Sequence, residues 1–167
     1  MDRRTFSKKL LEAITSFAIL NSLFTTNALS KTGQKEMKQL DVNIFENWLK
    51  KYFQAWEEGD PKLITDTFAE DGEYNLTPFT GRMKGKTEIY KYWEKGAQQA
   101  QENVITNYQI ITVKNNKGYA KWQAQFDRKG KREHVRLDGI MEVTFNDKLE
   151  VEIFNEWWHM QEEKNGD

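Results

Sequence analysis

The spacing of apolar residues changes once along this chain, near Val104, and that change limits the folds it can adopt. Before it, apolar side chains recur every three or four residues, which is typical of amphipathic helices. After it they alternate with polar ones, which is typical of strands with one buried face. The connections between the alternating runs are short and have turn compositions, so neighbouring strands should be antiparallel. Four strand-like runs result, at 103–113, 118–127, 132–145 and 149–160.

The segment before Val104 contains a helix boundary at Gly59-Asp60-Pro61. Gly59 suits the left-handed residue that ends a helix, Asp60 can cap the next helix, and Pro61 fits its first position. Asp41 is placed to cap the first helix. Three helices followed by a meander of strands make an α+β domain, with the helices on one face of a bent antiparallel sheet. We predict helices at 41–58, 61–69 and 87–101, and a short strand at 73–76.

One face of the first helix is rich in aromatic residues. Its apolar positions recur at steps of three and four: Phe45, Trp48, Leu49, Tyr52, Phe53 and Trp56. Such side chains can serve as plain core or can line a pocket, and their spacing fits both interpretations. In the third helix Gly96 costs about 1 kcal/mol relative to alanine. We therefore expect Gly96 to permit close contact with a neighbouring element.

The first thirty residues have the layout of a signal peptide. Basic residues precede a modestly apolar run over 10–24, and residues 28–30 (Ala-Leu-Ser) offer small side chains where a signal peptidase reads them. We predict that this segment is removed near residue 30. The alternative is an amphipathic N-terminal helix that belongs to the fold.

The segment 2–8 also resembles the twin-arginine export motif of bacteria, with Ser7 in place of the usual leucine. This resemblance implies export of a folded protein, so we expect a periplasmic or secreted location. Residues 31–40 should form a disordered leader. We expect no stable membrane anchor, because the apolar run is short and contains Glu12 and Asn21.

Composition excludes several classes of function. Without residues 1–30 the chain has 21 basic and 24 acidic residues, a formal charge of −3, so no nucleic-acid footprint is present. It has no cysteine, and its two histidines, His134 and His159, lie 25 residues apart. No EF-hand spacing, glycine-rich phosphate loop or nucleophile elbow occurs. We therefore predict neither a metal site nor a cofactor.

Several segments in order resemble the nuclear transport factor 2-like superfamily. They are the aromatic helix, the run EEGDPKLITDTFAEDGEY at 57–74, a loop with Gly81 and Gly85, the run IYKYW at 89–93 and the hairpin FNDKLEVEIFNEW at 145–157. The resemblance is strongest to its SnoaL-like, polyketide-cyclase-like branch, which also contains ketosteroid isomerase. It implies a cone-like curved sheet around a pocket over 41–160 and a homodimer formed through the sheet. The polar composition of residues 161–167 predicts a flexible tail.

The same resemblance allows functional positions to be compared. Tyr52 falls at the place of the tyrosine that serves ketosteroid isomerase as oxyanion donor. The general-base position, two residues beyond Tyr74, is occupied by Leu76, and the position of the second oxyanion acid by Met141. Neither side chain can exchange a proton, so the sequence does not support steroid-isomerase chemistry.

Strand registers decide which polar residues reach the pocket. On the run 132–145 every second residue from Val135 to Phe145 is apolar or glycine, and these residues should face inward. Asp138 is then outside unless a bulge shifts the register. On the last run, charge favours Asn155, Trp157 and His159 facing inward, whereas an isomerase-like register would turn the alternate set, with Glu156, inward. We favour the former register.

These observations predict an exported small-molecule-binding domain whose ligand is a small apolar or aromatic molecule. The alternative is a cyclase-, dehydratase- or isomerase-type enzyme in which Tyr52 donates a hydrogen bond and His159 or Asp138 is the base. A third possibility is a protein-interaction domain that uses the sheet face. The predicted pocket-lining residues are Trp56, Tyr74, Leu76, Trp93, Trp122, Met141, Asn155 and Trp157.

Overall fold

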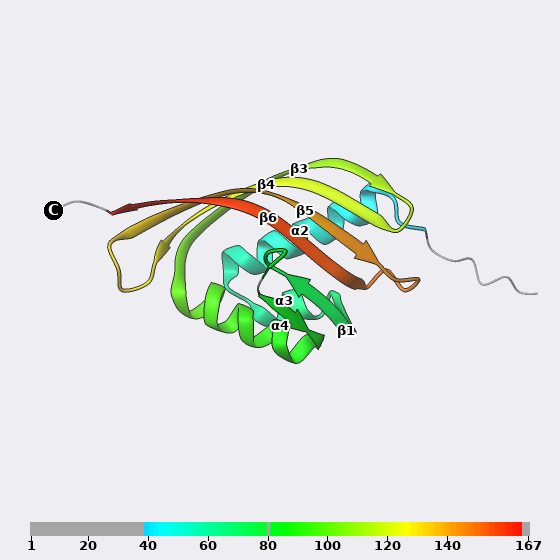
Figure 1. Ribbon diagram of the computed structural model, residues 1–167, viewed down its shortest axis with the longest axis horizontal. Helices are drawn as coiled ribbons and strands as arrows, with labels where there is room; N and C mark the ends of the chain where they lie inside the picture. The colour runs from blue at the N-terminus through cyan, green and yellow to red at the C-terminus, as the bar shows by residue number, and fades with distance from the viewer. Residues whose placement is uncertain (1–38, 80, 165–167) are drawn as a thin grey trace, which may run out of the picture. The chain divides into compact units, whose positions relative to one another are not determined.

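The computed structural model describes residues 39–79 and 81–164. Within them a curved, unclosed mixed sheet of six strands packs against three helices, which confirms the α+β cone (Figure 1). The strand order is β2-β1-β6-β5-β4-β3. The helical elements are α2 (Val42–Glu58), α3 (Pro61–Thr65), α4 (Gly85–Trp93) and a π-helical turn η1 (Glu94–Gln98). The strands are β1 (Phe68–Asn75), β2 (Arg82–Lys84), β3 (Gln101–Lys114), β4 (Lys117–Arg128), β5 (Glu133–Phe145) and β6 (Val151–Lys164).

The helix boundaries follow the predicted capping residues. The Asp41 carboxylate accepts a hydrogen bond from the Ile44 amide at 2.8 Å, and Gly59 ends α2 with φ 62°. Asp60 caps α3 in the same way, with Pro61 in the first turn. The second helix is shorter than predicted because the chain extends into β1 from Phe68. The third prediction, 87–101, corresponds to α4 and its continuation η1.

The sheet is mixed rather than wholly antiparallel. Strand β1 lies between β2, to which it is antiparallel, and β6, to which it is parallel. The prediction of an all-antiparallel sheet is therefore wrong at this edge. The short-connection rule gives the direction of consecutive strands only, and β1 and β6 are separated by most of the domain.

The concave face of the sheet carries the core. The predicted inward residues of β4 and the later inward residues of β5 are buried: Ala120, Trp122, Ala124, Phe126, Met141, Val143 and Phe145. These side chains meet the aromatic face of α2: between ring centroids, Trp48 lies 5.9 Å from Phe145 and Trp56 lies 5.5 Å from Trp122. The helices and the concave face thus share one core.

On β6 the favoured register is wrong. Val151 is buried as predicted, but the β5–β6 pairing shifts next to it, from Phe145↔Val151 to Thr144↔Ile153. The extra residue reverses the alternation beyond that point. Phe154 and Glu156 are therefore buried, whereas Trp157 is 48% exposed.

Two further predictions concern the ends of the domain. Strand β6 continues to Lys164, which pairs with Glu133, so the described part of the predicted tail is strand. The predicted signal peptide and most of the leader lie outside the described residues. Within 39–79 and 81–164 no helix is long and apolar enough to cross a membrane.

Candidate functional site: a cavity with a buried carboxyl group

A cavity of about 300 Å³ lies between the concave face of the sheet and the helical elements α2, α4 and η1. Six of the residues that the sequence assigned to a site line it: Tyr52, Trp56, Tyr74, Leu76, Trp93 and Trp122. Half of the lining residues are aromatic, and Trp122 packs edge-on against Trp56 with ring centroids 5.5 Å apart. Cavities of this size and lining are typical of sites for small apolar molecules.

Three polar side chains converge on the wall of this cavity. Tyr52 comes from α2, Tyr74 from β1 and Glu156 from β6, and the parallel pairing of β1 with β6 brings the last two together. The Tyr52 and Tyr74 hydroxyl groups are 2.7 Å apart, and the Tyr74 hydroxyl donates to Glu156 Oε1 at 3.5 Å. Because Tyr74 donates to the carboxyl group, Tyr52 donates to Tyr74.

Glu156 is unusual because its carboxyl group is buried without a cationic partner. The residue is 5% exposed, and among the described residues no ion pair includes it. Burial disfavours the charged form and raises the pKa of Glu156 to about 8, although the hydrogen bond from Tyr74 acts in the opposite direction. The carboxyl group is therefore mainly protonated at pH 7. A buried group that titrates near neutrality can accept or donate a proton during a reaction.

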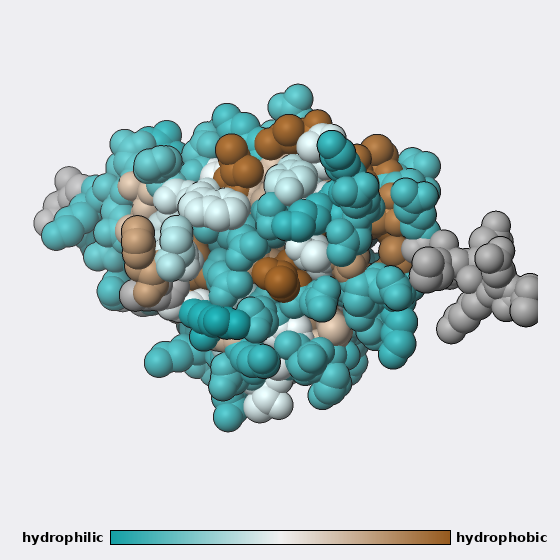
Figure 2. Space-filling view, turned by 45° about the vertical axis from the view of Figure 1, so that its right-hand side comes forward, coloured by the Kyte–Doolittle hydropathy of each residue, from teal (hydrophilic) through white to brown (hydrophobic). Residues whose placement is uncertain are grey.

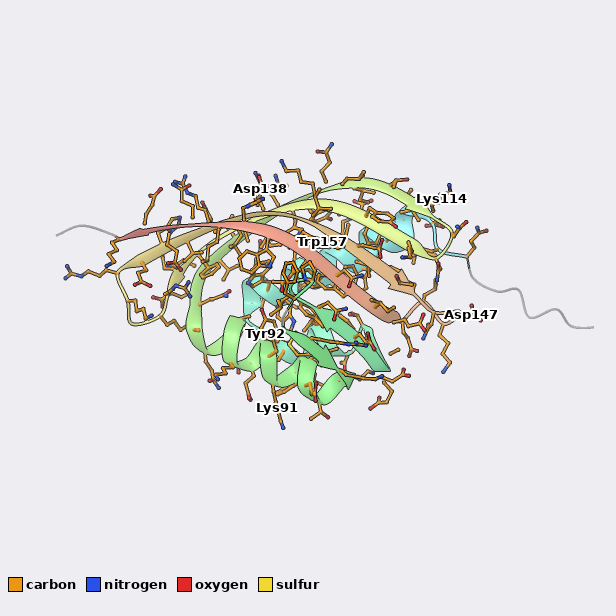
Figure 3. The ribbon with its side chains drawn as sticks, viewed as in Figure 1. Lys91, Tyr92, Lys114, Asp138, Asp147 and Trp157 are labelled. Carbon is orange, nitrogen blue, oxygen red and sulfur yellow. The ribbon has the colours of Figure 1, made fainter. Side chains whose placement is uncertain are left out.

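The tyrosines beside Glu156 remain protonated throughout the physiological range. Burial raises the pKa of Tyr52 and Tyr74 well above their usual range, and that of Tyr92 is raised for the same reason. Their hydroxyl groups are accordingly hydrogen-bond donors rather than bases. Figure 3 shows Tyr92 between α4 and the sheet.

Two other polar residues line the cavity, and each has partners of its own. Trp56 Nε1 donates to Gln101 Oε1 at 2.7 Å, which fixes the orientation of the Gln101 amide. Arg128 also lines the cavity, but its guanidinium contacts two carboxylates, those of Glu133 at 3.3 Å and of Glu162. Arg128 is therefore already neutralised and does not favour anionic ligands.

The two predicted bases lie on the other side of the sheet. Asp138 and His159 are directly opposite each other on β5 and β6, and both line a hollow of about 470 Å³ on the convex face. The Asp138 side chain is 50% exposed and accepts a hydrogen bond from Gln123 at 2.8 Å, which lowers its pKa. It points away from the helices in Figure 3. Neither residue can reach Tyr52 through the cavity, because the bulge and the regular β5 alternation place both outside.

Three predicted pocket residues also lie elsewhere. Met141 is fully buried in the core without lining the cavity. Asn155 and Trp157 line a separate hollow beside the β1–β2 loop, where the Asn75 amide donates to Asn155 at 2.9 Å. The register shift on β6 accounts for both displacements.

Sequence reasoning missed Glu156, Tyr92 and Gln101 as site residues. Only the alternative register of the last strand would have turned Glu156 inward, and a buried acid contradicts the usual preference of carboxylates for solvent. No signal marked Gln101, which begins β3 just beyond the π-helical turn. Within the described residues no group of three or more His, Cys, Asp or Glu side chains is arranged to hold a metal ion.

Two solved structures resemble this domain. One is the epoxide hydrolase/cyclase-like enzyme SalBIII, described for its role in pyran ring formation in polyether salinomycin (TM-score 0.62, 14% identity, 71% of this chain and 93% of that one). The other is a putative isomerase from Bacillus subtilis (TM-score 0.59, 20% identity, 70% of this chain and 89% of that one). At these identities the likeness shows the fold alone.

Sequence comparison gives the family. No curated protein sequence matches the chain significantly. A family model described as the SnoaL-like domain matches residues 49–153, a segment that includes α2 from Leu49 onward, the whole of β1 to β5 and the bulged start of β6. The chain belongs to the SnoaL-like domain family.

Proposed function

We propose that this domain binds a small, mainly apolar molecule that carries a hydrogen-bond-accepting oxygen, such as a ketone, in the cavity of the cone. The observation that supports this most is the buried carboxyl group of Glu156, held by Tyr74 and Tyr52 within aromatic walls. An isolated buried acid costs stability, so a functional use for it is favoured over a structural one.

The protonation state of Glu156 sets the chemistry of the ligand. With its pKa at about 8, the carboxyl group is neutral at pH 7 and has one O–H of its own. Tyr74 donates to Oε1, and no described residue accepts the acid's proton. That proton is therefore available to a ligand oxygen. The aromatic side chains around it lower the local dielectric constant, which strengthens such a hydrogen bond.

The test uses two probes of equal size. 2-Acetylnaphthalene carries a ketone oxygen, and 2-ethylnaphthalene replaces it with hydrogen atoms. We expect quenching of tryptophan fluorescence to show saturable binding of both, with the ketone bound about tenfold more tightly. Glu156→Leu should remove that preference while retaining binding of the hydrocarbon. If neither probe binds saturably, the proposal is wrong.

A second candidate function is cofactor-free proton transfer by Glu156. It is favoured by the pKa of about 8, which lets the carboxyl group act as a general acid at neutral pH and as a base above it. Glu156 takes the place of Asp138 and His159 in this scheme. Tyr74 would stabilise the carboxylate that remains after proton donation.

Deuterium exchange separates the two candidates. An enzyme of this kind should accelerate exchange of the acetyl methyl protons of 2-acetylnaphthalene in heavy water, as followed by NMR. Glu156→Gln, which keeps the size of the side chain but has no acid, should abolish the acceleration. Exchange at the uncatalysed rate with the wild-type protein would leave binding as the function.

We also propose export of the domain, on the strength of the layout of residues 1–30 alone. Cell fractionation should place a shortened protein outside the cytoplasm. Replacement of both Arg3 and Arg4 by lysine should retain the full-length precursor inside if the twin-arginine route is used. A full-length cytoplasmic wild-type protein would contradict the proposal.

A homodimer through the convex face is proposed as well. Ile140 and Trp157 pair across β5 and β6 there, and both remain about half exposed. Figure 2 shows apolar side chains that interrupt an otherwise hydrophilic surface. Light scattering at micromolar concentration should give the dimer mass, and Trp157→Glu should give the monomer. A monomeric wild-type protein would exclude this assembly.

A further inference from the structure

Gly96 lies in the wall of the cavity, in the π-helical turn η1 that follows α4. The sequence predicted that it allows close contact with a neighbour. The structure contradicts this, because a Cβ atom added at Gly96 would meet nothing within 4 Å. Space beside this residue is therefore empty of protein.

The backbone does not require glycine at this position either. The glycines with positive φ among the described residues are Gly59, Gly81, Gly85 and Gly130, and Gly96 is not one of them. Alanine is the better helix former at a helical position without positive φ. Neither packing nor conformation explains Gly96, which leaves the cavity itself as the reason for the missing side chain.

A hydrogen-bond donor lies in the wall of the same cavity. The Trp56 indole can only donate, so the oxygen of the Gln101 amide must face it. The amide nitrogen of Gln101 therefore points elsewhere, and among the described residues it has no partner. Gln101 is half-buried and lines the cavity together with Gly96. A donor without a partner beside an unfilled space is suited to an acceptor on a bound molecule.

We propose that Gly96 and Gln101 form a second subsite, which accommodates the far end of the ligand and donates a hydrogen bond to an oxygen there. The inference rests on the proposed function and deepens it. The ligand class becomes an elongated, flat, apolar molecule with an acceptor oxygen at each end. One oxygen binds at Glu156 and the other at the Gln101 amide nitrogen, and Gly96 gives room for the second group. The charge of Arg128 is already balanced by Glu133 and Glu162, so a neutral oxygen is favoured here over an anionic one.

The binding test adds one probe to the pair used above. 2,6-Diacetylnaphthalene carries a second ketone at the opposite end of 2-acetylnaphthalene. We expect the wild-type protein to bind the diketone about tenfold more tightly than the monoketone. Gln101→Glu keeps an oxygen for Trp56 but removes the amide donor, so it should abolish this gain. Gly96→Leu should weaken the diketone at least tenfold and the monoketone less than about threefold.

The stability test needs no ligand. Because nothing near Gly96 requires glycine, Gly96→Ala should raise the thermal midpoint by roughly 4 °C. Lys95→Ala, on the exposed side of the same turn, serves as the control and should change it little. A lower midpoint for Gly96→Ala would make the glycine structural and overturn the subsite.

The outcomes separate the subsite from the function on which it rests. Equal affinity for both ketones in the wild-type protein overturns the subsite and leaves the Glu156 site standing. Binding of neither ketone overturns both. A gain for the diketone that survives Gln101→Glu also overturns the subsite, because the second oxygen would then be bound elsewhere.

Discussion

The pKa values of two carboxyl groups on neighbouring strands of the sheet are shifted in opposite directions. Glu156 on β6 faces the concave side, is 5% exposed, and has its pKa raised to about 8 by burial. Glu142 on β5 faces the convex side, where a hydrogen bond from Lys117 at 2.8 Å lowers its pKa. The same residue type is therefore a buried neutral acid on one face and half of a surface ion pair on the other.

Two tryptophans also differ in burial between the two faces, but here the exposed residue is the unusual one. Trp122 on β4 faces the concave side and is 1% exposed, whereas Trp157 on β6 faces the convex side and is 48% exposed. Along β6 a buried acid is thus followed directly by an exposed aromatic ring. Such an inversion of the usual pattern costs folding free energy.

The largest expected difference between the faces concerns the tryptophans. Trp122→Ala should lower the free energy of unfolding by about 4 kcal/mol, because it leaves a cavity among Trp56 and the other rings. Trp157→Ala should lower the free energy of unfolding of the monomer by less than about 1 kcal/mol, since its ring is already half in solvent there. Urea denaturation of both variants measures the difference. Equal losses would mean that the faces are not distinct.

Glu156 and Glu142 are expected to make the free energy of unfolding depend on pH in opposite ways. Folded Glu156 keeps its proton up to about pH 8, whereas the unfolded chain releases it near 4.5. The unfolded state therefore binds fewer protons between these values, and stability falls as pH rises through this window. At pH 7 the accumulated cost is about 3 kcal/mol.

Denaturation between pH 3 and pH 9 tests this dependence. Glu156→Gln has no titrating group at this position, so the fall in stability should disappear. Glu142→Gln is the matched control, because the contribution of Glu142 to stability changes with pH in the opposite direction. The pKa of Glu142 is lowered on folding, so its contribution is present above its usual pKa of 4.5 and is lost as pH falls through the folded value. A Glu156→Gln variant with an unchanged pH profile would contradict the raised pKa.

The sequence predicted those parts of the fold that local chemistry determines. Asp41, Gly59 and Asp60 set helix ends through their own backbone and side-chain hydrogen bonds. The inward set of β4 could be predicted because only one of its two faces is apolar. On β6 both faces contain apolar residues, so either register satisfied the pattern, and the shift beside Val151 depends on pairing with β5.

The candidate site was harder to predict than the fold. Tyr52 and Tyr74 could be assigned to the pocket from their spacing and family resemblance, and both line it. Glu156 could not, because its position follows from the register shift and its partners lie on elements far apart in the sequence. The distant strand pairing that creates the polar cluster leaves no local signal.

Gly139 tests how tightly the concave face is packed. A Cβ atom at this position would lie 2.9 Å from the Trp122 ring and 2.7 Å from the Trp157 carbonyl oxygen. Gly139→Ala should therefore lower the free energy of unfolding by about 2 kcal/mol. Ile140→Ala, the next residue and on the convex face, should lower it by less than about 1 kcal/mol. A neutral Gly139→Ala would show that Trp122 can move into the cavity at little cost.

The smallest effects are expected at the convex pair of Asp138 and His159. The ion pair of Asp138 with Lys121 at 3.5 Å is half exposed, so screening by solvent keeps its contribution below about 1 kcal/mol. Asp138→Asn and His159→Gln should each leave affinity for 2-acetylnaphthalene within twofold of the wild-type value, because neither side chain lines the cavity. Fluorescence titration checks this. A tenfold loss in either variant would connect the two faces and restore these residues as candidates for the site.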